Sequence, residues 1–115
     1  MPKLKQVYRM DNLHRLFFKA FSNQTRLEII QLLRKNSLTV TEICEKTGFE
    51  QSRVSHNLRC LMHCGFVKVT QNGNFRKYAL DEETIIPIID LFEKHIQKYQ
   101  ERLENCGVIK DEKRL

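Results

Sequence analysis

Three glycines divide the middle of the chain into short segments with different periodicities. They are Gly48, Gly65 and Gly73. The first two follow segments whose apolar residues recur at helical spacing, and glycine is the residue that most often ends a helix. The third follows Asn72 between two runs of alternating residues, where Asn-Gly is a common hairpin turn. The sequence therefore predicts two helices, one through Lys46 and one over residues 51–63, followed by a β-hairpin over residues 66–80.

Two more helices are predicted before this unit. Apolar residues recur at helical spacing from Asp11 onward, and we expect residues 1–10 to form a flexible arm. Ser22 is the predicted N-cap of a second helix, because serine side chains often satisfy the free amides at a helix start. Residues 38–40 are predicted as a short strand. Thr41 is the predicted N-cap of the third helix.

The chain ends in a predicted long helix, residues 81–106, that begins between Asp81 and Ile85. Pro87 fits only in its first turns, where its missing N–H is tolerated. The apolar residues of this helix follow steps of four and three, as in a seam between paired helices. They are Ile85, Ile89, Phe92, Ile96, Tyr99 and Leu103. We therefore expect residues 81–106 to be a dimerisation helix that, with the first helix, joins two copies in a homodimer.

The predicted fold is mainly α with a small β-hairpin, in one domain over residues 1–115. The turn near Gly48 makes a helix-turn-helix of the third and fourth helices, and the hairpin that follows is a wing. The predicted order α-α-β-α-α-β-β-α is therefore a winged helix-turn-helix. We find no apolar run of about 18 residues for a membrane span and no secretory signal. We therefore expect a cytoplasmic protein whose four cysteines are reduced thiols.

Charge is distributed unevenly along the chain. The formal net charge is +6, and residues 51–80 hold five Lys and Arg residues without any Asp or Glu. Residues 81–105 instead carry seven acidic residues against three basic ones. A basic face on a small domain is typical of proteins that bind polyanions. This distribution favours double-stranded DNA as a partner, with an ordinary solvated surface as the alternative.

The fourth helix has one apolar and one hydrogen-bonding side. Val54, Leu58 and Leu61 fall together and should face the core. The opposite side carries groups suited to base edges and phosphates, and the second helix of a helix-turn-helix lies in the major groove. On the wing we expect basic contacts to phosphate, with entry of Arg76 into the minor groove as the alternative. The candidate DNA-binding residues are Gln51, Ser52, Arg53, Ser55, His56, Arg59, Arg76 and Lys77.

At these segments the chain resembles the ArsR/SmtB family of prokaryotic repressors, over about residues 13–105. Residues 16–30, LFFKAFSNQTRLEII, are similar to its opening signature. Residues 51–61 and 64–67 are similar to its recognition helix and exit, and residues 73–80 to its wing. The resemblance implies a homodimer that represses an operator-promoter until an effector binds, and many members sense metal ions.

The cysteines indicate which branch of that family the chain resembles. The arsenic branch has a Cys-Val-Cys box where this chain has Thr39-Val40-Thr41, and of the zinc branch's ligands only His95 is present. Cys60, Cys64 and Cys106 are instead similar to the cadmium- and lead-sensing branch. That likeness implies two thiolates on the recognition helix and a third from the C-terminal region of the partner subunit. The expected effector is Cd(II) or Pb(II), because thiolates select soft ions, and Zn(II) is the alternative.

Other assignments of the same residues remain open. Cys60 and Cys64 lie one helical turn apart, which suits a shared ion but also a thiol redox or persulfide switch. Cys44 is expected to pack in the core, and His63 and Glu104 are possible extra ligands. A protein-interaction module without DNA binding is a third hypothesis. The sequence has no phosphate loop or HExxH motif, and we expect no enzymatic activity.

Overall fold

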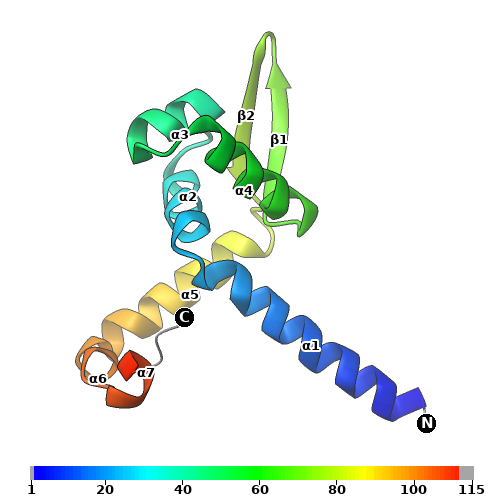
Figure 1. Ribbon diagram of the computed structural model, residues 1–115, viewed down its shortest axis with the longest axis vertical. Coiled ribbons are helices and arrows are strands. Elements are labelled where there is room, and N and C mark those ends of the chain that lie inside the picture. The colour runs from blue at the N-terminus through cyan, green and yellow to red at the C-terminus, as the bar shows by residue number, and fades with distance from the viewer. Residues whose placement is uncertain (1, 112–115) are drawn as a thin grey trace.

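The computed structural model describes the backbone of residues 2–111 and the side chains of residues 11–111. Its elements run α1 Pro2–Ser22, α2 Gln24–Lys35, α3 Val40–Thr47, α4 Gln51–His63, β1 Val67–Asn72, β2 Phe75–Leu80, α5 Ile85–Lys98, α6 Gln100–Glu104 and α7 Gly107–Asp111. The predicted mainly α winged helix-turn-helix is confirmed. Figure 1 shows α3, α4 and the hairpin at one end of the molecule, and α1 with α5, α6 and α7 at the other.

The core lies where α2, α3 and α4 meet the base of the hairpin and the start of α5. Its largest fully buried side chains are Ile29, Ile30, Ile43, Val54, Leu58, Leu61, Leu80 and Ile89. Burial of each such side chain contributes about 1.5–3 kcal/mol to the free energy of folding. Val54, Leu58 and Leu61 of α4 are among them, so the predicted inward side of this helix is confirmed.

Both predicted N-caps are displaced from the observed ones. Ser22 is the last residue of α1, and its hydroxyl donates to the carbonyl of Lys19 at 2.9 Å. The cap of α2 is Asn23, whose side-chain oxygen accepts from the amide of Arg26. The prediction of Thr41 as the cap of α3 is also wrong. Thr39 holds that position, because Glu42 three residues later completes a reciprocal capping box.

The prediction of a flexible arm over residues 1–10 is corrected from Pro2 onward; Met1 lies outside the described residues. Helix α1 begins at Pro2 rather than near Asp11. Proline is favoured at the first helical position, and residues 3–10 contain neither glycine nor a second proline to interrupt the helix. In Figure 1 this long helix points away from the rest of the fold.

The hairpin is antiparallel, and its register runs from Val67 opposite Leu80 to Asn72 opposite Phe75. The two-residue turn is therefore Gly73-Asn74 rather than Asn72-Gly73, and only the glycine takes a positive φ, of 64°. Leu38 forms an isolated bridge to Tyr78, so the predicted strand over residues 38–40 is reduced to one bridging residue. That bridge fixes the wing to the start of α3.

The predicted continuous helix over residues 81–106 is wrong. Helix α5 begins at Ile85 with Pro87 in its first turn, as expected, but it ends at Lys98. The backbone at Tyr99 leaves helical geometry, with φ −119° and ψ 26°. The Tyr99 ring is held there by the His95 ring, at 4.8 Å between centroids, and by the Arg102 guanidinium 5.0 Å from its centroid. Two short helices follow.

The predicted pairing seam is likewise divided between two uses. Ile85 and Ile89 are buried in the protomer's own core, and Phe92 packs against Phe21 of α1 with ring centroids 5.5 Å apart. Only Ile96 and Leu103 of the predicted seam are exposed, at 41% and 46%. The first half of the stripe therefore attaches α5 to its own domain, and the second half faces outward.

Among the helices of residues 2–111, none has the length and apolar character of a membrane span.

Candidate nucleic-acid interface and thiol pair

The outward side of α4 is polar and accessible. Gln51, Ser52, His56 and Arg59 are exposed, and Ser55 is half-buried. The N-cap residue of α4, Glu50, makes no side-chain hydrogen bond to the helix start. The first amides of α4 therefore remain able to donate to an external acceptor, and the helix dipole favours an anion there. This end of α4 has the donors that phosphates and base edges require.

Arg53 differs from the other predicted DNA-binding residues of α4. Its Nε donates to the hydroxyl of Thr25 at 3.0 Å, and its guanidinium stacks 4.0 Å from the centre of the Phe49 ring. Thr25 is buried at the start of α2, so these contacts hold α4 against α2. The structure thus gives Arg53 a packing role within the protein. Sequence reasoning missed this role because its partners come from two other segments.

The two predicted basic residues of the wing lie in different surroundings. Arg76 is exposed and lines a cleft of about 300 Å³ between β2 and α4, together with Ser55 and Arg59. Lys77 is half-buried on the same strand. Its positive charge contributes to a lowered pKa of Glu42, although hydrogen bonding from the Thr39 backbone is the largest cause. The structure therefore brings Arg76 beside Arg59, and brings Lys77 near the start of α3.

A wider cleft of about 690 Å³ separates the wing from the starts of α3 and α4. Gln51 and Arg76 line it, as do three residues that sequence reasoning did not select: Thr39, Asn74 and Phe75. Thr39 was missed because its cap position depends on Glu42, and Asn74 because the turn was displaced by one residue. Phe75 is an exposed aromatic residue, and the hydrophobic pattern gave no signal for it.

Cys60 and Cys64 lie one turn apart at the C-terminal end of α4. Cys60 is half-buried and Cys64 is exposed. Although Cys64 is exposed, desolvation of its thiol by neighbouring atoms raises its pKa, the neighbouring Cys60 raises it further, and the Arg26 guanidinium lowers it in part. The Cys64 thiol is therefore mainly protonated at neutral pH. Cys44 is half-buried and packs against the core, as expected.

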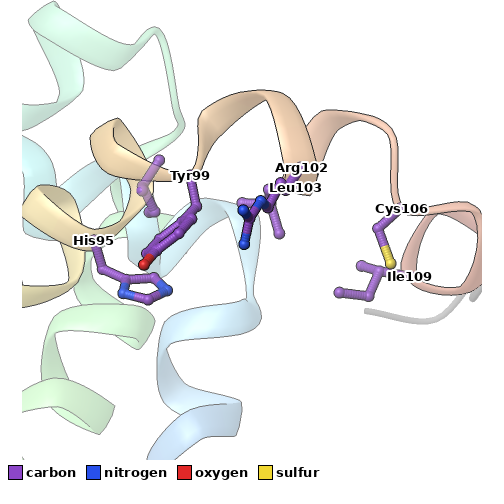
Figure 2. Close-up of a pocket in the computed structure, with 7 residues that line it drawn as sticks. His95, Tyr99, Arg102, Leu103, Cys106 and Ile109 are labelled. Carbon is purple, nitrogen blue, oxygen red and sulfur yellow. The ribbon is translucent and has the colours of Figure 1, made fainter.

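Cys106 lies at the junction between α6 and α7. It is half-buried and lines a hollow of about 430 Å³ with His95, Tyr99 and Arg102. Figure 2 shows its sulfur beside Ile109, with the His95 and Tyr99 side chains next to each other on the opposite side. Within the described part of a single protomer, no three His, Cys, Asp or Glu residues are grouped closely enough to hold a metal ion. Cys106 and the α4 pair therefore do not form a complete set in one chain.

The alternative ligands His63 and Glu104 are both exposed. His63 is the last residue of α4, and Glu104 is the last residue of α6. They lie on different helices and do not add a third donor to the α4 thiols within the described residues. The soft donors that lie together in one protomer are therefore the thiols of Cys60 and Cys64.

Comparison with known proteins places this architecture among transcriptional regulators. Residues 23–69 match the sequence model of a protein family described as "Bacterial regulatory protein, arsR family". The chain is 32% identical over 75 residues to a probable mercury resistance operon repressor of Streptomyces lividans, covering 65% of this chain and 60% of that protein. It is 35% identical over 78 residues to an HTH-type transcriptional regulator of Methanocaldococcus jannaschii, covering 67% of this chain and 88% of that protein.

A solved structure shows the same arrangement of elements. It is the homodimeric winged helix-turn-helix DNA-binding domain of a possible ArsR-family regulator from Mycobacterium bovis. The TM-score is 0.73 at 26% identity, and the match covers 85% of this chain and 90% of that one. The matched proteins are transcriptional regulators rather than enzymes, which confirms the expectation of no enzymatic role. From its sequence, its fold and the position of its wing, the chain belongs to the ArsR family of DNA-binding transcriptional regulators.

Proposed function

We propose that the protein is a homodimeric repressor that binds double-stranded operator DNA and leaves it when a soft metal ion binds. The ion is Cd(II) or Pb(II), with Zn(II) as the weaker candidate. Its ligands are the thiolates of Cys60 and Cys64 with Cys106 of the partner subunit. The observation that carries the proposal is a pair of soft donors one turn apart, Cys60 in the last turn of the helix that presents the DNA-reading side chains and Cys64 at its C-cap.

Operator binding is supported by the surface of α4 and the wing. Arg59 can donate two parallel hydrogen bonds to a guanine in the major groove. Arg76, beside it, adds a positive charge that attracts the phosphate backbone. Ser52, Ser55 and His56 supply further donors on the same side. The family relationship to an operon repressor supports repression as the outcome of binding.

Dimerisation is supported by the apolar surface at the other end of the molecule. Exposed large apolar side chains occur on α1 and on α5 to α7, including Leu16, Phe18 and Leu91. Large apolar side chains exposed in this number are unfavourable in water unless a partner covers them. The homodimeric Mycobacterium bovis domain supports a second copy as that partner.

The donor chemistry at the thiols fits a soft ion. Sulfur donors at i and i+4 on a helix can reach one ion, and thiolates favour Cd(II) and Pb(II) over hard ions such as Mg(II). A third donor is needed from outside the protomer, and Cys106 lies in the part of the chain that carries the exposed apolar surface. Bringing the partner's Cys106 to α4 would displace the recognition helix relative to the DNA.

The size of the required coupling is modest. A hundredfold loss of operator affinity corresponds to about 2.7 kcal/mol, which is within the usual range for coupling between two sites. A redox switch at the same thiols is less favoured, because a reactive thiol has a lowered pKa and the pKa of Cys64 is raised.

The test is a titration of the reduced protein with Cd(II), followed by the ultraviolet absorbance of the thiolate–metal bond. The wild type should bind one ion per protomer. Cys60→Ser and Cys64→Ser should each abolish tight binding, and Cys44→Ser, the matched control, should leave it unchanged. Equal binding by the Cys60→Ser, Cys64→Ser double variant would refute this site.

A mixing experiment tests whether the third thiolate comes from the partner. One protomer carries Cys106→Ser, and the other carries Cys60→Ser with Cys64→Ser. If dimers re-form at random, half are mixed and each mixed dimer has one complete site, so about a quarter of wild-type binding should return. No recovery after mixing would contradict sharing between subunits.

A further inference from the structure

One exposed aromatic side chain is not accounted for by dimerisation. Within residues 11–111, the exposed large apolar side chains on the dimerisation elements are Leu13, Leu16, Phe18, Leu91, Ile96, Leu103, Val108 and Ile109. The remaining one is Phe75, which is 64% exposed at the start of β2. It forms the last register pair of the hairpin, opposite Asn72 and next to the turn. Figure 1 shows the hairpin tip at the end of the molecule opposite α1 and α5.

We propose that Phe75 packs into the minor groove of operator DNA beside the site read by α4, and acts there as a specificity-determining residue. This inference rests on the proposed DNA binding. The wing lies next to α4, and Phe75, Arg76 and the α4 residue Gln51 border one cleft of about 690 Å³. A DNA strand that follows α4 in the major groove therefore meets the wing tip at the next minor groove.

Charge selects DNA over a protein as the occupant. Residues 51–80, which include α4 and the whole hairpin, hold no acidic residue. The carboxylate that lines the cleft, Glu42 of α3, accepts a hydrogen bond from the Thr39 amide at 2.9 Å. Phosphates border both sides of a minor groove, and Arg76 directly follows Phe75 in the sequence. One isolated ring is also far smaller than the apolar core of a stable protein interface. Apolar side chains in the minor groove instead contact sugars and base edges singly.

The chemistry of the ring defines how it discriminates between sequences. Phenylalanine has no hydrogen-bonding group, so it does not read the donor and acceptor pattern of a base pair. Its contact depends on the width of the groove and on how readily the neighbouring base step opens. Burial of about half of the ring should strengthen operator binding roughly tenfold.

The test uses an operator selected in vitro from random DNA, with binding measured by fluorescence anisotropy and sugar protection by hydroxyl-radical footprinting. Phe75→Ser should weaken binding about tenfold and remove protection of the flanking minor-groove sugars, while central protection persists. Phe75→Tyr keeps the ring and should retain both. The melting temperature of each variant is measured as a control for folding, and should be unchanged because the side chain is exposed.

The outcomes separate the two proposals. If the wild type binds no DNA, the proposed function fails and this inference fails with it. If the wild type binds but Phe75→Ser keeps its affinity and its flanking protection, only the role of Phe75 is overturned. A loss of affinity with unchanged flanking protection, or an equal loss with Phe75→Tyr, also overturns a minor-groove contact by the ring.

Discussion

The two ends of this molecule have surfaces of opposite chemistry. The end formed by α3, α4 and the hairpin exposes Arg59, Arg76 and short polar side chains, with Phe75 as its exposed large apolar residue. The end formed by α1 and α5 to α7 exposes eight large apolar side chains. Helix α2 lies between them (Figure 1), and its buried side chains belong to the core. A single domain can thus present one surface to DNA and another to a second protein chain.

The proposed sensing site connects these two surfaces. Cys60 and Cys64 end the helix of the polar surface, whereas Cys106 belongs to the apolar one. Phe66, two residues after Cys64, packs against Phe17 and Phe21 of α1 with ring centroids 5.2 and 5.1 Å away. The segment that directly follows the thiol pair is therefore packed against α1.

The largest expected effect comes from placing a charge on the apolar surface. Ile96→Glu should prevent dimerisation, because the carboxylate would lose its hydration in the interface. Operator affinity should fall by about a hundredfold or more, since each protomer would then contact one half-site alone. Sedimentation equilibrium measures the association, with Gln97→Glu as a neighbouring exposed control. A wild type that is monomeric at micromolar concentration would contradict the proposal that the apolar surface is a dimer interface.

The next effect concerns the polar surface. Arg59→Ala should cost about 1–3 kcal/mol of operator binding and relax sequence preference at one base pair. The melting temperature should not change, since the side chain is exposed. Anisotropy with specific and random DNA measures the difference. Equal weakening of both would mean that Arg59 contacts phosphate only.

Arg53 is the matched comparison on the same helix. Because it contacts Thr25 and Phe49, Arg53→Ala should lower the free energy of unfolding by about 1–2 kcal/mol. Chemical denaturation measures this loss. If Arg53→Ala left stability unchanged but impaired DNA binding as much as Arg59→Ala, the distinction drawn between these two arginines would be wrong.

Metal binding should depend on pH in a defined direction. Desolvation and the neighbouring Cys60 raise the pKa of Cys64, so its proton must be removed when a metal ion binds. The apparent affinity for Cd(II) should therefore rise with pH, by about tenfold per pH unit for each proton displaced, and level off above the raised pKa. Titrations from about pH 6 to 9 measure the rise in affinity, which lies below the raised pKa of Cys64. A pH-independent affinity would exclude thiols as ligands.

The smallest expected effect is on the attachment between the two ends. Arg34 of α2 forms ion pairs with Asp90 and, at 2.6 Å, with Glu93 of α5. These pairs raise the pKa of Arg34, chiefly through its hydrogen bond to Asp90. Because the three side chains are partly exposed to solvent, Arg34→Ala should lower the melting temperature only slightly. A large drop would show that this contact, rather than the core, attaches α5.

Local patterns predicted the elements of the fold well. The bounds of α4, the pairing of the two strands and the placement of Pro87 each depend on residues close in sequence. The break at Tyr99 could not be predicted in the same way, because no proline or glycine lies near it in the sequence. The assignment of Ile85 and Ile89 to the protomer's own core also required the three-dimensional arrangement.

The candidate site was predictable in composition but not in contacts. The sequence identifies the polar side of α4 and the spacing of Cys60 and Cys64. It does not reveal that Thr25, twenty-eight positions earlier in the chain, accepts from Arg53. It also gives no reason to select Phe75, whose importance depends on being exposed far from the other apolar side chains.

The most direct test of the account is release of operator DNA by metal. A fluorescent operator bound by the reduced wild-type protein is titrated with Cd(II), and anisotropy follows dissociation. We predict release of the wild type at about one ion per protomer, and continued binding by the Cys60→Ser, Cys64→Ser double variant at the same Cd(II) concentration. Release of the double variant at the wild-type concentration, or no release of the wild type, would contradict the account.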